Sequence, residues 1–157
     1  MNIIEATYDD ADLVGEVHSL AWKQAYKDIF PTEYIMADTT EKRKQEFLES
    51  FRKESCKYYL VYENGCCAGV VKAIFDNSMC EISSIYFLNE FRNKGLGTET
   101  ITQLKEIYKD YRIVLWTLEM NTVARNFYEK NGFVITANRR SIDRGKGFVQ
   151  VQYELKK

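Results

Sequence analysis

The segment from Glu81 to Tyr108 constrains the fold more than any other part of the chain. Residues 81–88 form a β-strand pattern, residues 98–108 follow helical spacing, and the turn between them is Arg92-Asn93-Lys94-Gly95-Leu96-Gly97-Thr98. A turn that enters a helix leaves several backbone N–H groups without partners, at the positive end of the helix dipole. Because such groups bind phosphate oxygens, the sequence predicts a strand–turn–helix unit that holds a phosphate-bearing ligand.

The remaining hydrophobic pattern predicts one mixed α/β domain over residues 1–157, with helices on the faces of a single sheet. Asn64-Gly65 predicts a type I′ hairpin turn, and Asn131-Gly132 is typical of the left-handed end of a helix. Strands are expected at 3–7, 58–63, 66–75, 79–88, 113–118, 133–139 and 147–155. Helices are expected at about 9–26, 31–36, 40–53, 97–109 and 122–130.

The charge balance disfavours several classes of partner. The chain has 22 Lys and Arg against 23 Asp and Glu, a net charge of −1, so no overall basic field attracts nucleic acid. No signal peptide is visible at the N-terminus, and no apolar run approaches the roughly 18 residues that would span a bilayer. The four cysteines lack a C-x-x-C spacing and a nearby histidine, which argues against a metal site. We therefore expect a cytoplasmic protein with no metal, no nucleic-acid partner and no membrane segment.

Two familiar nucleotide-binding motifs do not fit the glycine turn. A P-loop requires a lysine and a hydroxyl residue after its second glycine, and a dinucleotide fingerprint requires a third glycine where the chain has Thr100. A lone G-x-G is equally compatible with a helix start that uses glycine only for a tight turn. Arg92, the preceding strand and the amphipathic helix that follows favour phosphate binding.

The motif [R/Q]-x-x-G-x-[G/A] is matched by Arg92 to Gly97, and a second motif follows about thirty residues later. This is N-x-x-A-x-x-[F/L]-Y-x-x-x-G-F, which is met by Asn121, Ala124, Phe127, Tyr128, Gly132 and Phe133. With both motifs in order, the chain resembles the GCN5-related N-acetyltransferase superfamily over nearly its whole length. The resemblance implies a mostly antiparallel sheet of about seven strands, flanked by about four helices and splayed between the fourth and fifth strands.

The resemblance also implies a cosubstrate, acetyl-CoA, and a place for each of its parts. Backbone N–H groups of Arg92, Asn93, Lys94, Gly95, Leu96, Gly97 and Thr98 would hold the pyrophosphate. Pantetheine would lie in the splayed gap along Ile85, Tyr86 and Phe87, with contributions from Asn121 and Ala124. Asn121 is equally suited to cap the following helix. Gly95 and Gly97 would let the backbone approach the phosphates without a Cβ in the way.

Acetyl transfer to an amine requires a proton acceptor and a proton donor. Tyr128 matches the tyrosine that many relatives use to protonate the departing CoA thiolate, although a core aromatic residue is the alternative interpretation. Glu81 is the first candidate for the base, with a solvated carboxylate at a strand end as its alternative. Glu119 is the second candidate, and His18 is a residue that could line the acceptor cleft but better fits a packing role.

The acceptor side is less specified by the sequence. Trp22, Tyr26, Tyr34 and Glu119 are the candidate substrate-binding residues, because the segment 22–35 resembles the W-x-x-A-Y…P-x-x-Y-[I/L] pattern of one bacterial branch. Ordinary packing explains the three aromatic residues as well. We expect an acetyl-CoA-dependent N-acetyltransferase that acts on a small amine by direct transfer. The alternatives are acetylation of a protein N-terminus or lysine, and a CoA-binding sensor with little catalysis. Homodimers are frequent in the superfamily, but the sequence carries no interface signature.

Overall fold

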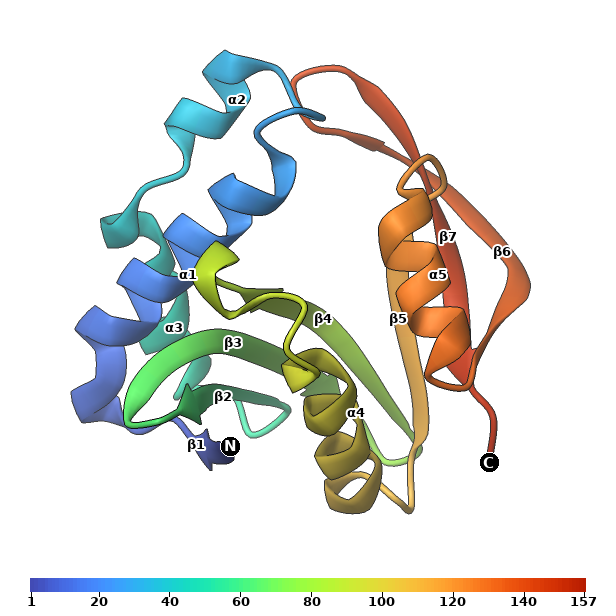
Figure 1. Cartoon of the computed structure of the whole chain (residues 1–157), viewed down its shortest axis with the longest axis horizontal. Coiled ribbons are helices and arrows are strands. Elements are labelled where there is room, and N and C mark those ends of the chain that lie inside the picture. Colours follow the sequence, from blue (N-terminus) through green and yellow to red (C-terminus); the bar gives the residue numbers. More distant parts are fainter.

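A computed structural model describes all residues 1–157 as one sheet flanked by helices (Figure 1). The strands are β1 (Asn2–Glu5), β2 (Cys56–Glu63), β3 (Cys66–Phe75), β4 (Met79–Phe87), β5 (Arg112–Leu118), β6 (Phe133–Asp143) and β7 (Gly147–Leu155). The α-helices are α1 (Ala11–Tyr26), α2 (Thr32–Ala37), α3 (Thr40–Ser50), α4 (Leu96–Ile107) and α5 (Thr122–Lys130). Two 3₁₀ turns, η1 (Tyr8–Asp10) and η2 (Asn89–Phe91), precede α1 and α4. Every predicted strand and helix is present, and the expected 40–53 helix ends at Ser50.

The sheet is splayed between its fourth and fifth strands. Its order is β1-β2-β3-β4-β5-β7-β6, and all neighbours are antiparallel except β4 and β5. The parallel pair is joined only from Met79 to Glu81, after which β4 and β5 diverge (Figure 1). Ser83 is an extra residue in β4, since Ile82 pairs with Ala73 and Ser84 pairs with Lys72. A bulge of this kind bends a strand, so it helps β4 leave β5 immediately after their last pair. The predicted mixed sheet with a gap is confirmed.

Helices cover both faces of the sheet. One core cluster lies under α4 and includes Ile101, Leu104, Ile113, Phe133 and Tyr153. The other lies under α1 and α3 and includes Val14, Val17, Phe47, Leu60 and Val70. In Figure 1, α4 and α5 stand in front of the sheet, whereas α1, α2 and α3 lie along its left side. The sheet therefore separates two core clusters, one on each of its faces.

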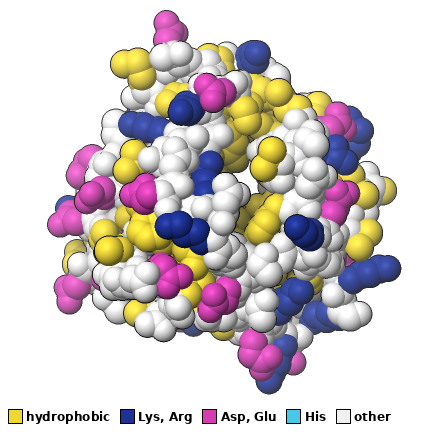
Figure 2. Space-filling view, viewed as in Figure 1, with side chains coloured by type: hydrophobic (Ala, Val, Ile, Leu, Met, Phe, Trp, Pro, Cys, Tyr) yellow, Lys and Arg dark blue, Asp and Glu magenta, His cyan; other side chains and the backbone are white.

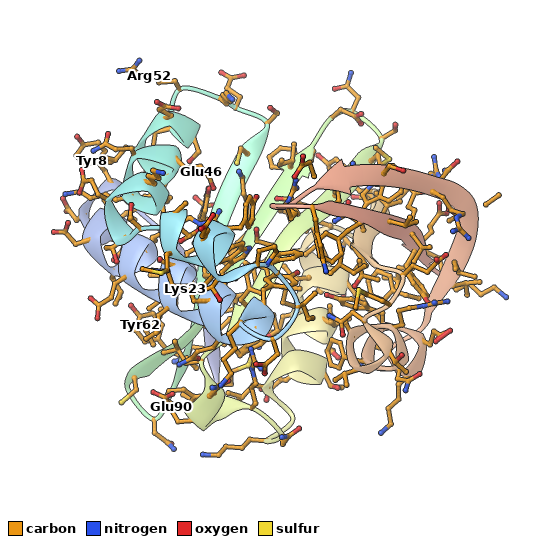
Figure 3. The ribbon with its side chains drawn as sticks, turned by 90° about the horizontal axis from the view of Figure 1, so that it is seen from above. Tyr8, Lys23, Glu46, Arg52, Tyr62 and Glu90 are labelled. Atoms are coloured by element: carbon orange, nitrogen blue, oxygen red, sulfur yellow. The ribbon has the colours of Figure 1, made fainter.

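The hairpin of β6 and β7 reaches across to the helical layer of the other side. A third buried cluster joins Trp22 and Phe30 from the α1–α2 region to Leu118 and Phe148 from the sheet. The turn of this hairpin lies against the start of α2, because a Cβ on Gly145 would stand 3.0 Å from atoms of both Pro31 and Tyr34. Figure 3 shows the hairpin curving toward this helical layer, with Glu46 on the inner side of α3 and Arg52 pointing outward. The β6–β7 hairpin therefore forms one wall of the space next to the gap between β4 and β5.

Local turn chemistry agrees with the sequence. Asn64 and Gly65 both have positive φ (51° and 78°), as a type I′ turn requires. Gly132, just past α5, has φ 91°, which is the left-handed conformation expected at a helix end. No helix in the structure has both the length and the apolar character needed to cross a bilayer.

Candidate active site

The turn before α4 presents unpaired backbone donors. Gly95 is the N-cap of α4 and has φ 80°, a conformation that glycine adopts without strain. The first helical hydrogen bond runs from the N–H of Glu99 to the carbonyl of Gly95 at 3.1 Å. The N–H groups of Leu96, Gly97 and Thr98 come before this bond and donate to no acceptor in the chain. They form the kind of backbone nest that favours an anion.

Arg92 connects this turn to the end of β4. Its Nε donates to the carbonyl oxygen of Phe87 at 3.1 Å, so the guanidinium holds the last residue of the strand. The turn is therefore held next to the part of β4 that has left β5. Figure 2, viewed from the same side as Figure 1, shows the surface hollowed near its centre. Hydrophobic side chains lie inside the hollow, and Lys and Arg side chains lie around it.

Gly97 has a packing role that the sequence did not suggest. A Cβ at this position would stand 2.8 Å from Cζ and 2.9 Å from Cε1 of the Phe127 ring. Gly97 therefore lets the ring from α5 rest directly on the first turn of α4. In contrast, a Cβ on Gly95 would meet nothing within 4 Å, so its backbone conformation is what requires glycine there.

We predict that Gly97→Ala lowers the free energy of unfolding by about 1–2 kcal/mol, because the added methyl overpacks the contact with Phe127. Alanine in a helix otherwise stabilises by about 0.5–1 kcal/mol relative to glycine, so the sign is diagnostic. Urea denaturation of Gly97→Ala, Phe127→Leu and the double variant measures the coupling. Additive effects, or a more stable Gly97→Ala protein, would contradict the contact.

Beyond Glu81, the side chains of β4 alternate between the two faces of the sheet. Ile85 and Phe87 pack against the cluster under α4, whereas Tyr86 packs against the clusters on the α1 side. The Tyr86 hydroxyl lies 3.3 Å from the hydroxyl of Tyr26 on α1. Burial raises the pKa of Tyr86 well above its ordinary value, and the charge of a Tyr26 phenolate would raise it further. The strand therefore offers a different surface to each side of the gap.

Tyr128 lies on α5 with its ring beside Phe133 and Tyr153, at centroid distances of 5.7 and 6.4 Å. No protein atom accepts or donates a hydrogen bond at its hydroxyl. Burial raises the pKa of Tyr128 above its ordinary value, and nearby Tyr26 acts in the same direction. The phenol is consequently held in its protonated form at neutral pH, which is the form that a proton donor requires.

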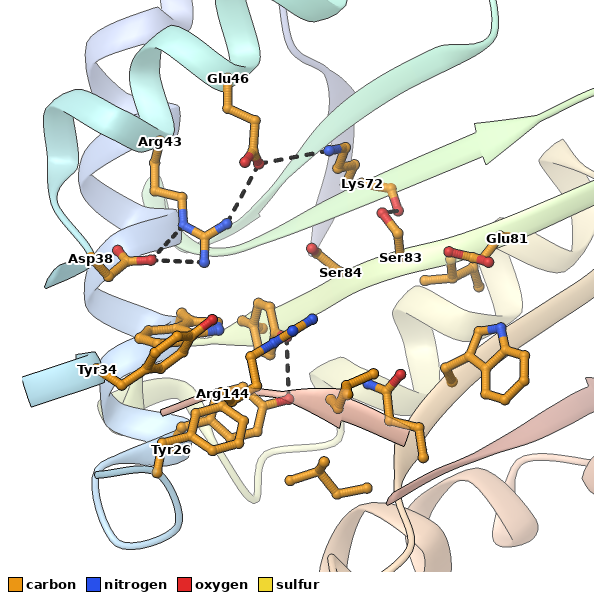
Figure 4. A pocket seen from close by; sticks show the side chains of 18 of the residues that line it. Tyr26, Tyr34, Asp38, Arg43, Glu46, Lys72, Glu81, Ser83, Ser84 and Arg144 are labelled. Carbon is orange, nitrogen blue, oxygen red and sulfur yellow. Dashed lines mark hydrogen bonds and ion pairs between the residues drawn. The ribbon is translucent and has the colours of Figure 1, made fainter. Parts of the chain in front are cut away.

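A cavity of about 580 Å³ lies on the other side of β4 (Figure 4). Its walls come from α1, α2, α3, β3, the diverging part of β4, the end of β5 and the β6–β7 hairpin. Of the residues predicted for the acceptor side, Trp22, Tyr26 and Tyr34 line it, and so does Glu81. The structure thus brings the predicted aromatic residues and the first candidate base into one cavity, although they are distant in sequence.

Glu119 lies elsewhere, in the connection between β5 and α5. Its carboxylate pairs with Arg139 at 2.7 Å, and its carbonyl accepts from Arg125 at 3.0 Å. It does not line the cavity. Asn121 caps α5, since its Oδ1 accepts from the N–H of Ala124 at 3.1 Å. The capping role that the sequence allowed for Asn121 is therefore present in the structure, and it is compatible with the predicted pantetheine contact.

The cavity is also lined by a group of charged residues that the sequence did not predict. Asp38 accepts from Ser19 Oγ at 2.7 Å and from Arg43 at 2.8 Å. Glu46 meets Arg43 at 3.4 Å and Lys72 at 3.6 Å, and it accepts from the Tyr58 hydroxyl. Figure 4 shows this network on the α3 wall. Asp38 follows α2, Arg43 and Glu46 lie on α3, and Lys72 lies on β3. Because these segments are separate in the sequence, no local motif predicts the group. No group of three His, Cys, Asp or Glu side chains is placed to hold a metal ion.

His18 is fully buried behind this wall, and neither ring nitrogen has a hydrogen-bond partner. It lies between the rings of Tyr58 and Tyr86 and does not line the cavity. Burial lowers its pKa well below 6.5, and the positive charges of Arg43 and Lys72 lower it further. A packing role, the one favoured from sequence, fits this environment.

His18 should make the fold sensitive to mild acid. Its pKa is lower in the folded than in the unfolded state, so the unfolded state binds the extra proton as the pH falls below about 6.5. The free energy of unfolding should fall in that range by up to about 1.4 kcal/mol per pH unit from this residue. In His18→Leu, chemical denaturation between pH 5 and 7 should show a flatter dependence. An unchanged slope would mean that His18 does not titrate differently on unfolding.

Comparisons with known proteins test the resemblance that the two motifs indicated. The model of the acetyltransferase (GNAT) family matches residues 13–133. The chain belongs to the acetyltransferase (GNAT) family. The match includes the turn before α4, the diverging strand β4 and Tyr128, and it confirms the resemblance noted from the two motifs. This GNAT chain is accordingly an acyl-transfer enzyme.

The proteins similar to this GNAT chain include a curated enzyme and acetyltransferases whose structures contain a bound coenzyme. It is 26% identical to spermidine N(1)-acetyltransferase of Thermoplasma acidophilum, over 86% of this chain and 89% of that protein. The crystal structure of PaiA N-acetyltransferase from Thermoplasma acidophilum in complex with coenzyme A covers 100% of both chains, with a TM-score of 0.76 and 23% identity. A GNAT family acetyltransferase from Elizabethkingia anophelis with acetyl-CoA bound covers 99% of this chain and 97% of its own, with a TM-score of 0.65 and 19% identity. The two structural likenesses confirm the fold.

Proposed function

We propose that this GNAT enzyme transfers the acetyl group of acetyl-CoA to a primary amine of a small molecule, within a ternary complex. One observation carries the proposal: the amide nest before α4 and the cavity both adjoin the stretch of β4 that has left β5. A diphosphate bound at Leu96, Gly97 and Thr98 would direct the rest of its chain toward the unpaired edge of β4. An amine in the cavity would approach the same edge from the other side. Relatives crystallised with CoA or acetyl-CoA support the choice of cosubstrate.

The residues present account for the proton movements of such a transfer. A primary ammonium first loses a proton, for which Glu81 is the carboxylate in the cavity that has no ion-pair partner. The amine then forms the C–N bond, and the C–S bond of the thioester breaks. The nitrogen loses a second proton, the CoA sulfur gains one from Tyr128, and Tyr128 regains a proton equivalent to the second one lost by the nitrogen. In sum one proton is released, so the products are an amide, the free thiol and one proton.

No cysteine is suited to carry the acetyl group in an intermediate. Cys80 is buried, and burial raises its pKa to about 12, while burial raises the pKa of Cys67 to about 11. Neither thiol would be ionised at neutral pH, and a thiolate is the nucleophilic form. None of the four cysteines lines the cavity. Direct transfer is the proposal that these environments favour.

Calorimetry with acetyl-CoA and with CoA tests cosubstrate binding, and assay of thiol release tests transfer. The proposal expects binding of both ligands and thiol release with small amines. Release only with peptides would instead favour acetylation of a protein N-terminus or lysine. Tight CoA binding without release across amines and peptides would favour a sensor. Failure to bind either ligand would overturn all three.

A further inference from the structure

The charges in the cavity are unequal. Asp38, Glu46 and Glu81 supply three carboxylates, whereas the cationic residues number five: Lys42, Arg43, Lys72, Arg140 and Arg144. A site for a polycation would be expected to show the opposite balance, because like charges repel a ligand from a partly enclosed cavity. The distribution of these charges indicates what the acceptor carries.

On the α3 wall, cations and carboxylates are matched. Arg43 and Lys72 face Asp38 and Glu46, with ion-pair distances from 2.8 to 3.6 Å. Hydroxyl groups of Ser19 and Tyr58 occupy further acceptor positions on the same two carboxylates. These two carboxylates are therefore already compensated within the protein. Lys42 on the same wall donates to the carbonyl oxygen of Ala37 at 2.9 Å and leaves the wall with one excess positive charge.

On the opposite wall, the two arginines of the hairpin have no carboxylate partner within 4.0 Å. Arg140 donates from Nε to the side-chain oxygen of Gln150 at 2.7 Å, and its guanidinium lies 4.2 Å from the centroid of the Trp116 ring. Arg144 donates from Nη1 to the carbonyl oxygen of Asp143 at 2.8 Å. Figure 4 shows Arg144 reaching into the cavity beside Tyr26 and Tyr34. Both guanidinium groups keep N–H donors that no protein atom accepts.

These two positions are held by the fold. The stacking of Arg140 on Trp116 and its bond to Gln150 hold the guanidinium plane on β5 and β7. Arg144 is half-buried, because the hairpin turn rests on Pro31 and Tyr34. Guanidinium groups bind carboxylate and phosphate through paired hydrogen bonds. Glu81 lies on the same cavity across from the hairpin, on β4, and it is the one carboxylate there without an ion-pair partner.

From this arrangement we infer that the acceptor is a primary amine that also carries an anionic group, a carboxylate or a phosphate, bound by Arg140 and Arg144. The amine end then points to Glu81 and the gap beyond it. The inference rests on the proposed acetyl transfer and specifies its acceptor. It separates this protein from a polyamine acetyltransferase such as the relative from Thermoplasma acidophilum, whose name specifies spermidine.

The test compares amines that differ in the anionic group alone. β-Alanine and its amide form one pair, phosphoethanolamine and ethanolamine form the second, and spermidine represents the polycations. We expect kcat/KM for the anionic member of at least one pair to exceed that of its uncharged partner and of spermidine by tenfold or more. Preference in the carboxylate pair identifies an amino acid type of acceptor, and preference in the phosphate pair identifies an amino phosphate. Equal rates within both pairs, or a preference for spermidine, would overturn the inference.

Variants connect the preference to the two arginines. Arg140→Ala and Arg144→Ala should each raise KM for the anionic amine about tenfold or more, with a smaller change in kcat, while KM for its uncharged partner changes little. Arg140→Lys should restore part of the preference, because it keeps the charge. Arg139→Ala is the matched control, since this neighbour on β6 pairs with Glu119 outside the cavity.

The outcomes keep the two proposals distinguishable. If both arginine variants acetylate every amine as the unmodified enzyme does, acetyl transfer stands and the anionic acceptor is refuted. If no amine is acetylated, the proposed function fails, and the anionic acceptor fails with it. Thermal melting of each variant confirms that a change in KM is measured on folded protein.

Discussion

Tyr128→Phe is expected to lower kcat about 100-fold or more, with the affinity for acetyl-CoA changing little. A positioned proton donor contributes about 10²–10⁴-fold to a reaction of this kind. The substitution removes only the hydroxyl, which has no hydrogen-bond partner in the protein. The ring contacts with Phe133 and Tyr153 remain, so the fold should be preserved. Steady-state kinetics and calorimetry with acetyl-CoA separate the loss of turnover from any loss of binding.

A matched control is Tyr111→Phe, which removes a phenol hydroxyl from a residue that packs against Phe75 and Tyr108, away from the cavity. Its kinetics should equal those of the unmodified enzyme. If Tyr128→Phe also has unchanged kcat, another group protonates the thiolate. The residue would then be the core aromatic that the alternative interpretation of the sequence described.

Glu81→Gln should produce the second large effect, a fall in kcat/KM for the amine of about 100-fold near pH 7. An amine with a pKa near 10.4 is mostly protonated at that pH, and removing its proton costs about 4.6 kcal/mol. The variant cannot accept this proton, so its defect should shrink as the pH rises toward 10 and the free amine becomes abundant. Profiles of kcat/KM against pH for both proteins measure this convergence.

Glu119→Gln is the informative comparison, because Glu119 was the other candidate base from sequence. Its carboxylate is paired with Arg139 and lies outside the cavity, so we expect little change in rate. A larger loss in Glu119→Gln than in Glu81→Gln would assign the base to Glu119. A defect in Glu81→Gln that stays constant across the pH range would mean that Glu81 acts by position and not as a proton acceptor.

The parts of the site that the sequence predicted well are those set by neighbours along the chain. The glycine turn before α4, the Asn121 cap of α5 and the Asn64-Gly65 hairpin each depend on a few consecutive residues. The place where β4 leaves β5 was available only through resemblance. Its physical cause includes a bulge at Ser83, which depends on pairing with β3.

The role of Gly97 shows the limit of a local argument. The sequence suggested that both glycines of the turn clear space for phosphates, and that explanation depends only on the turn itself. The structure adds a different requirement, the Phe127 ring from a helix that begins 25 residues later. Because the two positions meet only after α4 and α5 pack on the same face, no pattern within the turn could reveal it.

The amino-acid sequence by itself determined the order of elements, the family and the amide nest, because periodicity, glycine conformation and helix caps act over a few residues. Only the tertiary structure decided what faces the acceptor. Asp38, Arg43, Glu46, Lys72, Arg140 and Arg144 come from segments more than a hundred residues apart at the extremes and have no common spacing. Their charges are paired or left free according to how α3, β3 and the β6–β7 hairpin meet around one cavity, and that is settled by packing across the sheet.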